Sequence, residues 1–105
     1  MYAVVRQYEV GAGSLADFMG YVEDELGDTM AALPGFLSYY VIASGEDEIV
    51  SATIFEDEQG ALRSSRAAAD FVRDRLGPFQ VNLTSTMGGE VGVWRSAPAM
   101  SRHPE

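Results

Sequence analysis

The stretch from Pro34 to Asp57 is the part of this chain that most constrains its fold. It reads PGFLSYYVIASGEDEIVSATIFED and holds two runs rich in β-branched and aromatic residues, separated by the polar residues 44–47. Two such runs around a short polar turn containing glycine are typical of a β-hairpin. We therefore expect strands at 36–43 and 48–55, the first entered through a Pro-Gly pair and the second followed directly by a helix.

Both faces of this expected hairpin are largely apolar. Alternate residues of a strand point to opposite faces. In the second strand the two faces carry Val50, Ala52 and Ile54 on one side, and Ile49, Ser51, Thr53 and Phe55 on the other. A small antiparallel sheet with helices on one side normally shows one polar face. The second apolar face thus predicts a cover that the chain itself does not supply, and the simplest cover is the sheet of a second copy. We expect a homodimer.

Two segments show helical periodicity. The first spans 15–33 behind Ser14 as N-cap, and the second spans roughly 58–76 behind Asp57 as N-cap. Residues three and four apart share one face of a helix. The expected apolar stripes are Leu15, Phe18, Met19, Val22, Leu26, Met30 and Leu33 in the first helix, and Leu62, Ser65, Ala69, Val72 and Leu76 in the second.

Two further strands complete the order. Residues 2–10 form a β-branched and aromatic run of strand length, and a last strand is expected near Glu90 to Arg95. The order β-α-β-β-α-β predicts an α+β, ferredoxin-like fold: a four-stranded antiparallel sheet with two helices on one face, closed by dimerisation into an α/β barrel. A single domain is expected over 1–95, followed by a flexible tail at 96–105.

Composition excludes several classes of function. The chain has 105 residues, enough for one domain with a modest core. Its formal charge of −9 argues against nucleic acid, whose phosphates need a basic surface. It has no cysteine, which removes disulfides and thiolate chemistry. No apolar run approaches the ~20 residues of a membrane span, and the first residues lack the pattern of a signal peptide. We expect a cytoplasmic protein without membrane contact.

No standard catalytic set and no metal site are indicated. The single histidine, His103, lies in the expected tail without partners for a catalytic triad. The acidic run from Glu46 to Glu48 is better explained as a solvated hairpin tip than as an ion site. We expect no metal and no cofactor.

Aromatic residues are the more informative feature. Phe18 falls on the first helix, Tyr40 on the first hairpin strand and Phe55 on the second, and the chain has five tyrosines. A buried tyrosine hydroxyl needs a hydrogen-bond partner and suits a pocket for a polar aromatic ligand. The competing interpretation is that these residues fill the core and the dimer interface.

Arg6 is a candidate interface or anion partner. It shares a strand face with Val4 and Tyr8, which is an unusual place for a cation. An uncompensated buried charge is costly. We therefore expect Arg6 to pair with an acidic side chain across a subunit interface, or else to bind an acidic ligand.

The segments PGFLSYYVIAS and IVSATIFEDEQGA resemble the antibiotic biosynthesis monooxygenase domain. The resemblance runs from the opening VVRQY strand to the closing EVGVW segment, and it includes the helix ending in LPGF and the strand that leads into an acidic-capped helix. It implies a ferredoxin-like fold that dimerises by facing two sheets into a barrel.

Some members of that family are cofactor-free oxygenases of polycyclic phenols. In those relatives an asparagine, and a tryptophan four residues later, line the pocket from the third strand. These positions fall here on Ser51 and Phe55, and both are departures. Serine lacks the paired donor and acceptor of an amide, and phenylalanine lacks the indole N–H. The haem-degrading branch fits less well, because the second helix carries no histidine.

Two functions follow from this resemblance. In the first, a pocket lined by Phe18, Tyr40, Ser51 and Phe55 binds a hydrophobic phenol- or quinone-like molecule and oxidises it with O₂, without a cofactor. In the second, the protein is a non-catalytic dimeric binding or interaction module that has lost the catalytic residues of the family.

Overall fold

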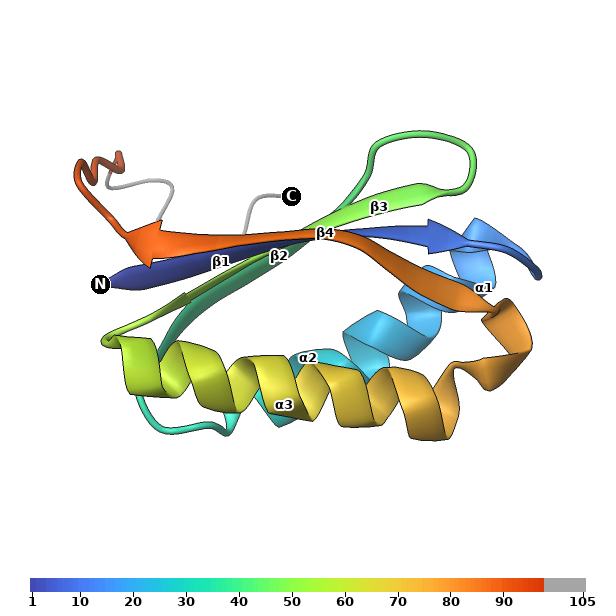
Figure 1. Ribbon diagram of the computed structural model, residues 1–105, viewed down its shortest axis with the longest axis horizontal. Coiled ribbons are helices and arrows are strands. Elements are labelled where there is room, and N and C mark those ends of the chain that lie inside the picture. The colour runs from blue at the N-terminus through green and yellow to red at the C-terminus, as the bar shows by residue number, and fades with distance from the viewer. Residues whose placement is uncertain (98–105) are drawn as a thin grey trace.

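The computed structural model describes residues 1–97, and it confirms the ferredoxin-like α+β fold (Figure 1). The elements in chain order are β1 (Tyr2–Val10), α1 (Leu15–Tyr21), the π-helical η1 (Val22–Leu26), α2 (Gly27–Ala31), β2 (Phe36–Ala43), β3 (Glu48–Phe55), α3 (Glu58–Arg75), the 3₁₀ turn η2 (Gly77–Phe79) and β4 (Val81–Glu90). The four strands form one antiparallel sheet in the order β2-β3-β1-β4.

All helices lie on one side of this sheet (Figure 1). The side of the sheet that faces them is buried. In β3, for example, Ile49, Ser51, Thr53 and Phe55 are buried, whereas the residues between them are partly exposed. The alternation expected for this strand is therefore confirmed, and it places every second side chain of the central strands against the helices.

The first helical segment is interrupted by a π-helical turn. Ser14 caps it as expected, because its hydroxyl accepts a hydrogen bond from the Asp17 backbone N–H at 3.0 Å. The expected stripe is confirmed where the segment meets the sheet, with Phe18, Val22, Leu26 and Met30 buried. The π-helical turn η1 was not expected. π-helical turns are uncommon and often occur at functional sites, and this one holds Val22 and Leu26 against the sheet.

The expected stripe of the second helix is confirmed at Leu76, which is buried, and wrong at two other positions. Leu62 is 52% exposed and Ala69 is also exposed, whereas Ala61, Ser64 and Ala68 are buried. The buried face is built from small residues that let α3 approach the sheet closely. The sequence pattern favoured Leu62 because leucine is strongly hydrophobic. The close contact between α3 and the sheet requires small side chains instead, and hydrophobicity does not reveal that requirement.

The expected last strand is also wrong in position. β4 spans Val81–Glu90, and residues 91–97 have no regular secondary structure. β4 pairs with β1 at the edge of the sheet, where most of its side chains are exposed. Because most side chains of this edge strand are exposed, they form no clear apolar pattern. The sequence pattern therefore placed the last strand in the more apolar segment that follows. Most of the expected tail, residues 98–105, lies outside the described residues.

The sheet face opposite the helices carries exposed apolar side chains from three strands. Val5 lies on β1, Tyr40 and Ile42 on β2, and Met87 on β4, each between 40% and 67% exposed. Val5 pairs with both Ala52 and Met87 in the two strand registers, so these side chains share one face. This is the apolar second face that the sequence predicted.

Among residues 1–97, the helices lack the combination of length and apolarity that crossing a bilayer demands.

Candidate functional site

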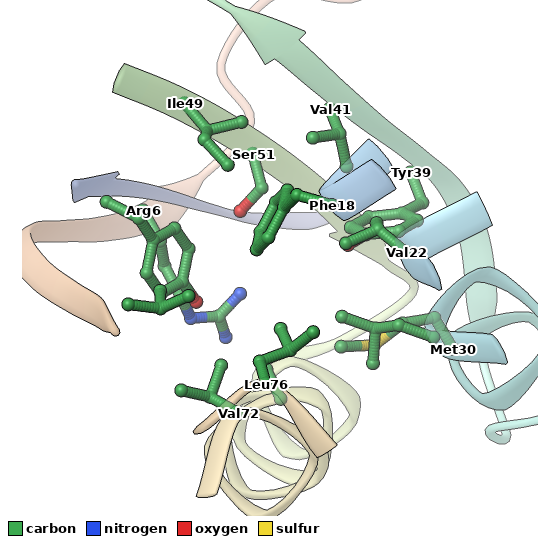
Figure 2. A pocket seen from close by; sticks show the side chains of 14 residues that line it. Arg6, Phe18, Val22, Met30, Tyr39, Val41, Ile49, Ser51, Val72 and Leu76 are labelled. Atoms are coloured by element: carbon green, nitrogen blue, oxygen red, sulfur yellow. The ribbon is translucent and has the colours of Figure 1, made fainter. Parts of the chain in front are cut away.

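A cavity lies in the core between the sheet and the helices (Figure 2). Its polar and aromatic lining comes from four elements: Arg6 and Tyr8 of β1, Phe18 of α1, Tyr39 of β2 and Ser51 of β3. Aliphatic side chains and Met30 complete the wall. The cavity volume is about 20 Å³, which is room for about one water molecule.

The strands place these groups by simple alternation. Arg6 and Tyr8 are two residues apart on β1 and therefore point to the same face. Arg6 pairs with Ser51 in the register of β1 and β3. Figure 2 shows the guanidinium of Arg6 directed into the space between Ser51 and Phe18 on one side and Val72 and Leu76 on the other.

Arg6 is the charged group of the cavity, and it is only 4% exposed. One of its terminal nitrogens donates a hydrogen bond to Ser65 Oγ of α3, and this hydroxyl donates in turn to the Ala61 carbonyl at 3.1 Å. Within residues 1–97, no carboxylate lies within 4.0 Å of the Arg6 guanidinium. Burial lowers the pKa of Arg6, and charges on Tyr8 and Tyr39 would oppose that shift. Arginine is not deprotonated in proteins, so the side chain stays charged.

The two tyrosines beside Arg6 stay neutral. Burial raises the pKa of Tyr8, and Arg6 opposes that shift. Burial, followed by the influence of Tyr8, raises the pKa of Tyr39 to about 12, again against Arg6. Their hydroxyls can therefore donate hydrogen bonds to a bound molecule at neutral pH, but they do not neutralise the guanidinium.

Two surface grooves approach the cavity from opposite edges of the sheet. A groove of about 580 Å³ between the first helical segment and β2 shares Val22, Tyr39 and Val41 with the cavity wall. A groove of about 240 Å³ between α3 and β4 shares Arg6, Tyr8 and Val72 with it. Only a single layer of side chains therefore separates the cavity from each groove.

The structure brings two of the four expected pocket residues together. Phe18 and Ser51 line the cavity. Tyr40 lies on the opposite face of the sheet, 55% exposed, and borders only surface grooves. Phe55 is fully buried beside Phe36, with their ring centroids 5.8 Å apart, and it does not line the cavity.

The sequence reasoning missed Tyr8 and Tyr39 as lining residues. Tyr8 follows directly from Arg6 by strand alternation. Tyr39 does not, because the register of β2 shifts between Phe36 and Ser38. Phe36 packs toward the helices, so an unbroken strand would place Tyr40 there as well. The shift moves Tyr39 and Val41 to the helix side instead.

The expectation of an acidic partner for Arg6 across a subunit interface stays a prediction. Arg6 faces the helices, away from the exposed sheet face that carries Val5 and Ile42. Of its two expected roles, its position inside the cavity favours contact with a ligand.

The described residues contain no cluster of three or more histidine, cysteine, aspartate or glutamate side chains suited to a metal ion. His103 lies outside the described residues.

The chain resembles known proteins both in sequence and in fold. Residues 1–74 match the model of the family described as Antibiotic biosynthesis monooxygenase. Comparison of the sequence with curated proteins finds no match.

Solved structures with the same fold share little sequence with this chain. The NE2512 protein of unknown function from Nitrosomonas europaea has a TM-score of 0.71 and 16% identity, over 91% of this chain and 93% of that one. A dimeric ferredoxin-like protein from an uncultured marine organism has a TM-score of 0.68 and 11% identity, over 91% and 98%. SnoaB, a cofactor-independent oxygenase from Streptomyces nogalater, has a TM-score of 0.60 and 18% identity, over 92% and 96%. At these identities the likeness supports a common fold.

Proposed function

This chain belongs to the antibiotic biosynthesis monooxygenase family, and from that premise we propose that it binds a hydrophobic, phenol- or quinone-like aromatic molecule between its helices and its sheet. The observation that carries the proposal is the lining of the cavity. Three aromatic rings, from Tyr8, Phe18 and Tyr39, surround it together with the polar groups of Ser51 and Arg6. Apolar walls with a few converging polar groups are typical of small-molecule sites.

Binding of a multi-ring ligand requires the cavity wall to move. At about 20 Å³ the closed cavity is far smaller than such a molecule. The wall toward the larger groove is formed by Val22, Tyr39 and Val41. Val22 is the first residue of the π-helical turn η1, where the regular α-helical hydrogen bonding changes. A change in this turn would join the groove of about 580 Å³ to the cavity.

The proposed reaction is an oxygenation without a cofactor, as the name of SnoaB states for that protein. An anthrone-type substrate has a methylene carbon that can become a carbonyl. That carbon gains one atom of O₂, and both of its hydrogens leave with the other atom as water. The substrate itself supplies the electrons. The protein promotes deprotonation of the substrate and holds the resulting anion in position.

Oxygen uptake tests this activity directly. With an anthrone-type phenol in an oxygen electrode, the wild-type protein should consume O₂ faster than the buffer alone. Phe18→Ala and Ser51→Ala should reduce the rate, because both residues line the cavity. Leu62→Ala serves as the control, since Leu62 lies on the outer surface of α3 and is 52% exposed. Uptake equal to the buffer blank, or equal in all variants, would remove the oxygenase proposal.

The second candidate is a dimeric binding or interaction module without turnover. The small volume of the closed cavity favours it, as do Ser51 and Phe55 at the positions where catalytic relatives carry asparagine and tryptophan. Ligand binding without oxygen uptake in the same assay would select this alternative.

We also propose that the protein is a homodimer. The supporting observation is the exposed apolar face formed by β1, β2 and β4, which is larger than the isolated apolar residues usual on a monomer. The relative from the marine organism is named as dimeric. Two copies that face these surfaces toward each other would bury them by a symmetric contact.

A further inference from the structure

Two exposed arginines of α3 are paired with carboxylates, whereas the buried Arg6 has no carboxylate partner within residues 1–97. Arg73 and Arg75 lie on the surface with more than half of each side chain exposed, and both have carboxylate partners: Asp70 and Asp74 for Arg73, and Glu25 for Arg75. Arg6 is almost completely buried and has none among residues 1–97. Proteins normally pair the buried charge first, because water no longer stabilises it.

The described residues offer the Arg6 guanidinium few hydrogen-bond acceptors. A guanidinium has five N–H donors arranged as a planar fork. Among the described residues, the Ser65 hydroxyl is its acceptor. Its other polar neighbours in the cavity, Tyr8, Tyr39 and Ser51, are all neutral at physiological pH. The cavity therefore holds a full positive charge with no negative group beside it, in a chain whose net charge is −9.

The groove between α3 and β4 leads to this charge. It has a volume of about 240 Å³, and apart from its cations its wall is apolar or aromatic, from Tyr8, Ala69, Val72 and Leu83. Arg6 lies at its buried end and Arg73 at its exposed rim. Such a groove suits a flat apolar body with one negatively charged group at its leading end.

We propose that Arg6 is the anion-binding residue of the pocket, and that it holds the oxyanion of a small aromatic acid at the buried end of the groove between α3 and β4. The inference rests on the proposed function, because it concerns the same pocket and names the chemical class of its ligand. The oxyanion is a carboxylate or a phenolate, since both present oxygen lone pairs to the guanidinium fork.

Matched ligand pairs test this assignment by calorimetric titration. The carboxylate arm compares naphthalene-2-carboxylate with the neutral naphthalene-2-carboxamide. The phenolate arm compares 2,4-dinitrophenolate with the neutral 2,4-dinitroanisole. The wild-type protein should bind at least one anion about tenfold or more tightly than its neutral counterpart, because a charge-assisted contact is lost in the latter. The arm that shows the preference identifies the type of oxyanion.

Arg6→Met should abolish that preference while the neutral compound still binds. Arg66→Met is the control, because Arg66 is exposed on α3 and does not line the groove. Methionine matches much of the length of arginine without its charge. Arg6→Met should therefore fold at least as stably as the wild type, and thermal unfolding without ligand verifies this. A less stable Arg6→Met variant would itself count against an uncompensated charge at this position.

The outcomes separate this inference from the proposed function. If anions and neutral compounds bind equally in the wild type, the aromatic pocket stands and the role of Arg6 is overturned. A preference for anions that survives in Arg6→Met also overturns it. If neither kind of compound binds, the proposed aromatic pocket falls together with the inference.

Discussion

At the scale of single residues, the cavity is lined by polar groups whose lost hydration is only partly replaced by contacts with the protein. Tyr39 lies beside Arg6 and Tyr8, and burial is the largest cause of its raised pKa. Its phenol is consequently held in the neutral form by the folded protein. A raised acid pKa is also a statement about stability, because the unfolded chain releases that proton at lower pH.

Stability should therefore fall at alkaline pH through Tyr39. Its pKa is 10.0 in the unfolded chain and about 12 in the fold. Above pH 10 the unfolded state loses the proton first, so the stabilisation that is present below that pH is lost as the pH rises toward 12. Between about pH 9 and about pH 11 the expected loss from Tyr39 is roughly 1 kcal/mol. Urea unfolding at the two pH values measures it.

Tyr39→Phe is the matched variant for this prediction. It has no ionisable group at this position, so its stability should fall less between the same two pH values. Part of the decrease will remain, because the pKa of Tyr8 is raised as well. Equal decreases in the variant and the wild type would contradict the assignment to Tyr39.

At the scale of elements, the contact between α3 and β3 depends on a glycine. Asp57 begins α3 by accepting a hydrogen bond from the Gly60 N–H at 2.9 Å, which holds the first turn over the end of β3. A Cβ at Gly60 would lie 2.7 Å from Cδ2 of Phe55 and 3.1 Å from its Cβ and Cγ. The side chain of Phe55 is fully buried and packs on Phe36, so it has little room to move.

Gly60→Ala should therefore destabilise the protein, by about 1–3 kcal/mol, since overpacked cores cost that much. Gly20→Ala is the control within the first helical segment, where a Cβ meets nothing within 4 Å. There the gain in helix propensity should stabilise the protein by up to about 1 kcal/mol. Urea unfolding compares the two variants, and a neutral or stabilising Gly60→Ala would show that α3 does not pack on Phe55 as described.

At the scale of the whole molecule, the sheet separates two surfaces of different character. On one side lie the helices and the closed cavity (Figure 1). On the other side, Val5, Tyr40, Ile42 and Met87 are exposed. A layer that is apolar on both sides is stable in water when both sides are covered. A second copy of the chain provides the missing cover in our proposal.

Two leucine-sized residues with nearly the same exposure distinguish the two surfaces. Ile42 on the open sheet face is 53% exposed, and Leu62 on the outside of α3 is 52% exposed. Analytical ultracentrifugation at micromolar concentration should find the wild type and Leu62→Glu dimeric. Ile42→Glu should be monomeric, because a carboxylate buried in the interface would lose its water without gaining a partner. A folded wild-type monomer, or a dimeric Ile42→Glu, would contradict the sheet-face dimer.

The sequence by itself determined the order of elements, the bounds of β1, β2 and β3, and the burial of the first helical stripe. These features depend on local periodicity and on caps such as Ser14 and Asp57, which neighbouring residues specify. It also predicted the apolar second face from the alternation of β3.

Only the tertiary structure decided which side chains share the pocket. Tyr39 replaces Tyr40 there because β2 shifts its register against β3, and Phe55 lies outside the pocket, packed against Phe36 and close to Gly60 of α3. β4 is located by pairing with β1 across 70 or more residues and not by its own exposed side chains. Register, close approach and edge pairing are contacts between segments distant in the chain, so no local pattern encodes them. The absence of a carboxylate beside Arg6 within residues 1–97 is also a tertiary property, since it depends on which side chains the other elements place around it.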